Sequence, residues 1–219
     1  MLVLWLVACS LGLQAVEGDV VEGGTSNTED YPPIEEDLSG HVYIVQQDDF
    51  RITEPPDLID YQNQLFNRPM LFYVNDQAKD RLQLSMTLAA GDGNQDRCQP
   101  VRSLPTSDFS QNPTFSLGPE ELRTSLGDQG MTLFKFMMEA TFAEEGSNIR
   151  LGTITAVLRA EDLVPVIPEA DCRFIEDLGG ECHGCPGGTE GCFDLELSAL
   201  RGRWQAQASF DPRETGDCQ

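Results

Sequence analysis

Four cysteines and one histidine, gathered in a single short stretch, are the residues of this chain best suited to chemistry. The stretch 171–193 reads DCRFIEDLGGECHGCPGGTEGCF and holds four of the seven cysteines, one of the two histidines and six of the 20 glycines. Because glycine is unfavourable inside helices and strands, we expect a loop that is fastened by its own sulfur atoms. Such thiols could form disulfides, bind zinc or carry out redox exchange.

The spacing of these cysteines favours disulfides over the other two chemistries. A four-cysteine zinc site usually combines two C-x2-C pairs, but this loop has only Cys182 and Cys185 at that spacing. A redox C-x-x-C lies at a helix start in a βαβ unit, whereas these flanks are rich in glycine. Disulfides account for all six cysteines beyond the amino-terminal segment: Cys98, Cys172, Cys182, Cys185, Cys192 and Cys218. We therefore predict three disulfides and neither a metal nor another cofactor.

The pairing of these six cysteines stays open, because many connectivities are compatible with the sequence. A Cys182–Cys185 bridge is disfavoured, since closing so short a ring strains the bond geometry. Cys185–Cys192 is the local bridge that we prefer.

Other candidate sites are weaker. Asp92, Asn94 and Asp96 alternate as oxygen ligands for Ca²⁺ do, but the EF-hand glycine is missing and Arg97 stands in its place, so a polar turn is favoured. His41 and His183 are the only histidines, and no serine-nucleophile elbow, H-E-x-x-H or phosphate loop is present. We therefore expect no enzyme, and a carboxylate-dependent hydrolase is the alternative that the many acidic residues leave open.

The amino terminus indicates export. MLVLWLVACS is an apolar run that ends in a cysteine, and Leu6-Val7-Ala8-Cys9 resembles the lipobox of bacterial lipoproteins. The resemblance implies that residues 1–8 are a signal peptide and that Cys9 is acylated, which anchors the protein to a membrane of the bacterial cell envelope, in our prediction the outer membrane. An ordinary signal peptide cut near Ala15 and a buried first strand are the alternatives. Under either export reading six cysteines remain, an even number that suits an oxidising compartment.

Charge defines the classes of partner. The 37 acidic and 14 basic residues give a formal net charge of −23. This excludes a general nucleic-acid binder, which needs Lys and Arg to neutralise phosphates. Residues 9–37 are acidic and poor in apolar side chains, so we predict a disordered tether that follows the acylated cysteine.

Short runs of alternating or β-branched apolar residues predict an all-β fold for residues 38–219, as a single domain that contains the loop 171–193. We expect an antiparallel sandwich or barrel of about eight strands with long loops. In the run 131–142 we place Phe134, Phe136, Met138, Ala140 and Phe142 on one face. The run 149–159 changes phase near Gly152, which indicates a bulge. We expect a long connection at 51–69, one short helix opening at 119–122, and strands at 41–45, 70–74, 81–89, 114–117, 193–197 and 204–210, with another short strand at Cys98.

In general plan the chain resembles small β-rich bacterial lipoproteins. Three features carry this resemblance: the predicted acylated cysteine, the acidic spacer and the late cysteine loop. This resemblance implies no particular activity. We expect a lipid-anchored structural or binding module, with two alternatives: the hydrolase, and a calycin-like barrel that binds a small apolar ligand. The interior of the β domain discriminates among them. Converging acids favour the hydrolase, a filled apolar interior favours the module, and an open apolar cavity favours the ligand binder.

Overall fold

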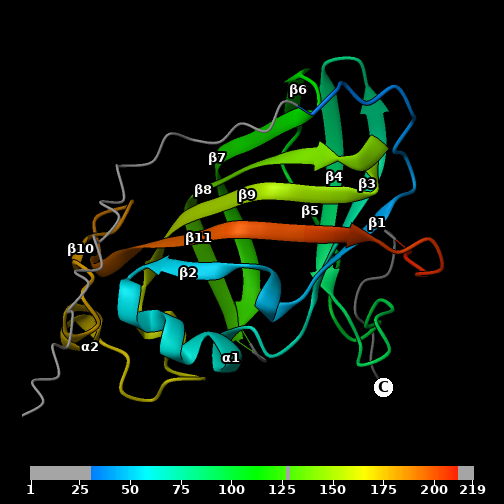
Figure 1. Ribbon diagram of the computed structural model, residues 1–219. Coiled ribbons are helices and arrows are strands. Elements are labelled where there is room, and N and C mark those ends of the chain that lie inside the picture. Colours follow the sequence, from blue (N-terminus) through cyan, green and yellow to red (C-terminus); the bar gives the residue numbers. More distant parts are fainter. Residues whose placement is uncertain (1–30, 127–128, 212–219) are drawn as a thin grey trace, which may run out of the picture. The chain divides into compact units, whose positions relative to one another are not determined.

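The computed structural model describes residues 31–126 and 129–211, which belong to one compact unit. Half of the chain is in strands and 15% is helical. Eight antiparallel strands form a closed barrel, in the order β1-β3-β4-β6-β7-β8-β9-β11, so the predicted fold class is confirmed (Figure 1). Their bounds are β1 Val42–Val45, β3 Met70–Ala78, β4 Arg81–Leu88, β6 Ser107–Gln111, β7 Thr114–Leu126, β8 Gln129–Ala143, β9 Asn148–Arg159 and β11 Glu190–Trp204.

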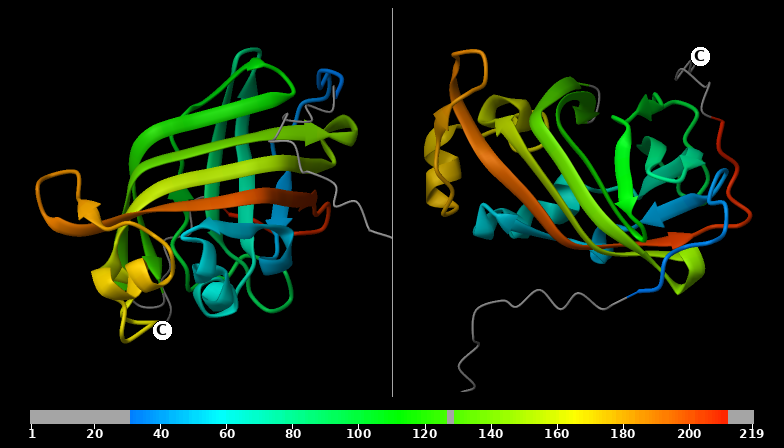
Figure 2. Two further views of the ribbon diagram at one scale, coloured as in Figure 1. Left: turned by 60° about the vertical axis from the view of Figure 1, so that its left-hand side comes forward. Right: turned by 90° about the horizontal axis from the view of Figure 1, so that it is seen from above.

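Strand β1 closes the barrel because it pairs on both sides. Tyr43 lies opposite Phe72 of β3 and opposite Trp204 of β11. Strands β7, β8, β9 and β11 run side by side and curve around the interior (Figure 2). Three shorter strands pair with barrel strands without being members of the closed ring: β2 (Arg51–Glu54) and β10 (His183–Gly184) with β11, and β5 (Arg102–Ser103) with β4.

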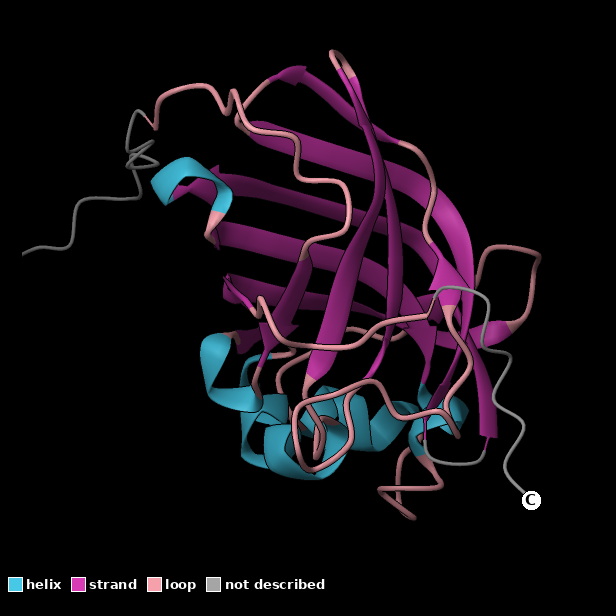
Figure 3. Cartoon of the chain, turned by 90° about the vertical axis from the view of Figure 1, so that its right-hand side faces the viewer, coloured by secondary structure: helices cyan, strands magenta, loops and turns pink. Residues whose placement is uncertain are grey.

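Most helical segments gather at one end of the strands (Figure 3). Two of them, η2 (Pro56–Tyr61) and α1 (Gln62–Leu65), follow each other directly and cover this end of the barrel. We call this segment, residues 56–66, the lid. The helical elements are η1 Gln47–Asp49, η2 Pro56–Tyr61, α1 Gln62–Leu65, η3 Glu144–Gly146, η4 Ala160–Leu163 and α2 Cys172–Asp177.

Aromatic side chains fill one half of the barrel. The Phe142 ring lies with its centroid 5.5 Å from that of Tyr43, 5.9 Å from Phe109 and 5.0 Å from Phe115. All four side chains are fully buried. The Tyr43 hydroxyl donates a 2.5 Å hydrogen bond to the Gly146 carbonyl, and burial raises the pKa of this phenol. This end of the barrel is therefore a packed plug.

Backbone bulges shift the phase of the long strands. Lys135 in β8, Leu151 in β9 and Ala199 in β11 have φ values of 50°, 55° and 55°, and the pairing register shifts at each. The predicted phase change near Gly152 is thereby confirmed. The bulge at Lys135 contradicts the predicted face of Phe134, which lies on the outside against Val157.

The helix predicted at 119–122 is wrong, because these residues lie within β7. Gly118 has a φ of +91°, and a Cβ there would lie 2.1 Å from the Phe136 carbonyl oxygen, so the strand bends at this glycine rather than stopping. The only helix predicted from sequence is therefore a strand, and the two α-helices of the described residues lie elsewhere.

The cysteine stretch 171–193 is not a pure loop, since α2 lies inside it. The Asp171 carboxylate accepts a 2.8 Å hydrogen bond from the Phe174 amide and so caps the helix.

Other predicted segments also differ from the structure. The stretch predicted as a connection, 51–69, holds β2 and the lid, and Cys98 lies in a turn rather than in the predicted short strand. The predicted last strand, 204–210, is also wrong, because β11 ends at Trp204.

Packing against the barrel begins before Leu38. The Ile34 amide donates to the Asn112 side chain at 2.8 Å, and the Asn112 side-chain amide donates to the Ile34 carbonyl at 2.9 Å. Ile34 is buried, so contact with the barrel starts within the last part of the range 9–37 that was predicted as tether. The predicted signal peptide, residues 1–8, and the predicted acylation site, Cys9, lie outside the described residues.

Candidate functional site

An apolar cavity of about 140 Å³ occupies the half of the barrel that the aromatic plug does not fill. Alternate residues of two strands line one wall, where the period of two directs their side chains inward: Ile154, Ala156 and Leu158 of β9, and Phe193, Leu195 and Leu197 of β11. These two sets of alternating residues thus form one wall of the cavity.

The rest of the cavity wall is rich in methionine. Met70 begins β3, Met86 lies in β4 and Met131 lies in β8, and all three line the cavity. Methionine has a flexible side chain that adapts to irregular space. This wall can therefore change shape around an occupant more readily than the aromatic plug can.

The lid closes the cavity at the end of the barrel with Leu58, Leu65 and Phe66. The buried side chain of Gln62 fixes this segment. Its oxygen accepts from the Ile52 amide at 3.1 Å, and its nitrogen donates to the carbonyls of Gln47 at 2.6 Å and Phe50 at 3.0 Å. One side chain thus ties the lid to β2 and η1.

Polar groups are sparse in this cavity. Of the described lining residues, two are polar, Asn67 and Thr124, and none is Asp, Glu or His. The cavity therefore offers no carboxylate pair from its described lining.

A smaller cavity of about 40 Å³ adjoins the first and shares Met86, Leu88 and Thr124 with it. Its other lining side chains include Gln99 and Arg102. The Arg102 Nε atom is buried and has no hydrogen-bond partner. The apolar cavity is thus bordered by a polar compartment that carries a cation.

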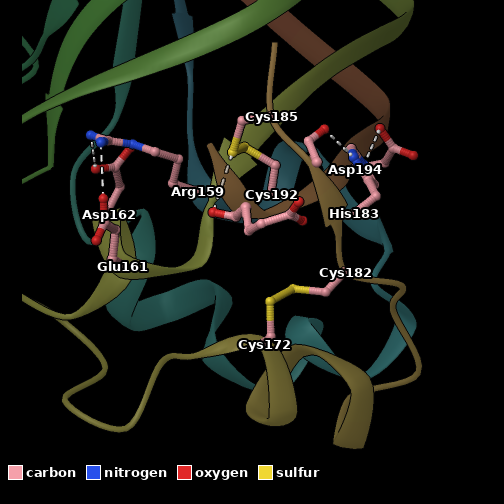
Figure 4. The surroundings of a disulfide bond; sticks show 11 residues. Arg159, Glu161, Asp162, Cys172, Cys182, His183, Cys185, Cys192 and Asp194 are labelled. Carbon is pink, nitrogen blue, oxygen red and sulfur yellow. Dashed lines mark hydrogen bonds and ion pairs between the residues drawn. A yellow bond between two sulfur atoms is a disulfide. The ribbon is translucent and has the colours of Figure 1, made fainter. Parts of the chain in front are cut away.

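The cysteine stretch lies outside the barrel wall and contains two disulfides, Cys172–Cys182 and Cys185–Cys192 (Figure 4). The preferred local bridge is therefore confirmed. Cys98 has a partner and is not a free thiol, whereas Cys9 and Cys218 lie outside the described residues, so the third bridge stays a prediction. Disulfides persist in oxidising compartments, so this domain belongs to an exported environment.

The weak Ca²⁺ candidates are occupied by other contacts. The Asp92 carboxylate accepts from the backbone and side-chain nitrogens of Asn94, both at 3.0 Å, and these bonds hold its pKa below the usual value. Asp96 instead accepts from the Cys98 amide and forms an ion pair with Arg68. The three side chains belong to a turn, and within the described ranges no group of three or more His, Cys, Asp or Glu is placed to hold a metal.

The two histidines lie apart from the cavity lining. His41 stacks on Trp204 with ring centroids 4.4 Å apart, and its pKa is lowered, mainly by burial. His183 lies beside Asp194, with 3.5 Å between Nε2 and the nearer carboxylate oxygen (Figure 4). Neither histidine lines the cavity, so neither lies beside a candidate catalytic residue there.

Comparisons of the chain with protein-family models, curated proteins and solved structures gave no match. None of the helices in the described part of the chain is long and apolar enough to span a membrane.

Sequence reasoning missed the lid, Gln62 and Arg102. No local pattern marks Gln62 or Arg102. Gln62 bonds to residues 10 to 15 positions away, and Arg102 is placed by its pairing with a neighbouring strand.

Proposed function

We propose that the protein binds a small apolar ligand inside its barrel. The observation that carries this proposal is the apolar cavity itself, which is enclosed by β9, β11 and the lid. An empty apolar cavity of about 150 Å³ in another protein stays dry and binds benzene or xenon, so a space of this size is sufficient for a ring or a short chain. An open apolar cavity is the interior that we expected for a ligand binder, as opposed to converging acids for a hydrolase or a filled interior for a structural module.

The rival functions receive less support. A hydrolase would need acids that converge on a cleft, and the described cavity lining contains none. A purely structural module would favour a filled interior, since unfilled apolar space costs roughly 24 cal/mol per Å³. A ligand in the cavity would offset this cost, because it restores the van der Waals contacts that the lining side chains lack.

Filling the cavity from within tests the proposal. Ala156→Leu adds three carbon atoms to the cavity wall, so we expect the folded variant to lose binding of benzene and of 1-octanol by at least about tenfold. Thr155→Val is the matched control, since Thr155 precedes Ala156 in β9 and points to the opposite face. Binding is measured by heteronuclear NMR titration of the cavity methyl groups. Unchanged binding in Ala156→Leu, or no binding by the wild type, refutes the proposal.

We also propose that the ligand-binding domain is held at the bacterial outer membrane by an acylated Cys9. The lipobox-like Leu6-Val7-Ala8-Cys9 and the exported character of a disulfide-bonded domain support this. Several acyl chains give stable anchoring, at about 0.8 kcal/mol per buried methylene. Cys9→Ala should move the protein from the membrane fraction to the soluble fraction and abolish incorporation of labelled fatty acid. Absence of incorporation in the wild type contradicts the anchor.

A further inference from the structure

Arg102 lies on the inner side of the barrel wall. In the β4–β5 pair it is directly opposite Met86, and residues directly opposite each other in antiparallel strands project to the same face. Met86 lines the apolar cavity, and both residues line the adjoining polar compartment. The guanidinium group is therefore directed to the place where the two cavities meet.

No other guanidinium in the described residues combines burial with a missing partner. Arg68, Arg150 and Arg159 form ion pairs with carboxylates, as is expected in a chain with 37 acids and 14 bases. No hydrogen bond or ion pair joins the Arg102 side chain to a described residue, and its Nε atom is buried. A buried donor without a partner carries a desolvation penalty, so an acceptor that enters the compartment and bonds to this nitrogen is favoured.

A carboxylate is the acceptor that best fits this buried donor. The Nε and one Nη of arginine form a fork that matches the two oxygens of a carboxylate. Gln99 and Thr124 line the same compartment and can donate further hydrogen bonds. No acidic side chain lines either the compartment or the apolar cavity among the described residues, so an incoming anion meets no local like charge.

We propose that the ligand is a medium-chain carboxylate, with its head group on Arg102 and its alkyl chain in the apolar cavity. This inference rests on the proposed function and adds the class of ligand. The cavity is close in size to one that holds the six carbons of benzene, so a chain of about six to eight carbons fills it. Affinity should rise about fourfold per methylene up to this length and then level off.

The test compares octanoate with 1-octanol, which has the same chain length without the charge. Binding to the full folded domain is measured at neutral pH by isothermal titration calorimetry. We expect octanoate to bind the wild type roughly 10- to 100-fold more tightly than 1-octanol, because a hydrogen bond to a charged group contributes more than one to a neutral group. Arg102→Met should abolish this preference, so that octanoate binds no more tightly than 1-octanol does.

Arg123→Met is the matched control. Arg123 precedes Thr124 in β7, is exposed and pairs only loosely with Glu121, at 3.4 Å, so its loss changes net charge equally without touching the compartment. The preference for octanoate should survive in this variant. Retained 1-octanol binding in Arg102→Met also shows that the barrel is folded.

The outcomes separate this inference from the proposed function. If both compounds bind the wild type equally well, or if Arg102→Met keeps the preference for octanoate, the carboxylate site is refuted and the apolar ligand site stands. If neither compound binds the wild type, both proposals fail.

Discussion

Replacing Gln62 by leucine should destabilise the domain and loosen its lid. The side chain is 9% exposed and makes three hydrogen bonds to backbone groups of Gln47, Phe50 and Ile52. At about 1 kcal/mol net for each bond, the variant loses roughly 3 kcal/mol of the free energy of unfolding. Because typical domains are stable by about 5–15 kcal/mol, this loss is readily measured.

The control is Gln64→Leu. Gln64 is two residues away in the same helix, α1, and it is exposed. An exposed substitution of this kind typically changes stability by less than about 0.5 kcal/mol. Urea denaturation of both variants gives the difference in free energy, provided that the slopes of the two transitions agree.

Amide hydrogen exchange locates the effect. The Ile52 amide donates to Gln62, so its protection should fall in Gln62→Leu and persist in Gln64→Leu. If Gln62→Leu stays within about 0.5 kcal/mol of the wild type and Ile52 keeps its protection, then the side chain does not organise the lid and the reasoning is wrong.

Two further predictions concern sulfur and pH. Replacing Cys185 and Cys192 together by alanine should cost roughly 2.5 kcal/mol from loop-closure entropy, since the bridge spans a sequence separation of 7; an unchanged urea midpoint contradicts this. Hydrogen bonds from the Cys98 amide and from Arg68 hold the pKa of Asp96 below its usual value, so the unfolded chain binds the proton more tightly. The stability that Asp96 contributes is present above the unfolded pKa and lost as pH falls through the lower folded pKa. Asp96→Asn should therefore reduce the fall in the urea midpoint below about pH 5, and an acid limb identical to that of the wild type contradicts the assignment.

The barrel was predictable where the residues alternate with a period of two. In β4, Leu82, Leu84, Met86 and Leu88 alternate with polar residues in the sequence, and the last two line the cavity. β11 likewise directs Phe193, Leu195 and Leu197 inward. Such patterns record burial directly, so they fix the class of fold without any knowledge of which strands pair.

Positions with positive φ limited the sequence prediction. A non-glycine residue such as Lys135 gives no compositional sign of a bulge, yet its φ of 50° moves Phe134 to the outer face and brings Leu133 to the cavity. The lid was missed for a related reason. Its stability depends on Gln62, and the hydrogen bonds of one polar side chain to residues 10 to 15 positions away leave no periodic pattern.

The division of the barrel into a filled half and an open half has a physical origin in residue type. Phe142 and its three aromatic neighbours are large and rigid, and they close one half completely. The other half is lined by aliphatic side chains, by the small Ala156 and by methionines, whose flexibility lets them fill space only loosely. A rigid floor beneath an adaptable wall fixes how deeply a chain can enter while tolerating variation in its shape. The polar compartment with Arg102 adjoins this open half at Met86, so the same arrangement that leaves room for an alkyl chain also places a cation at its end.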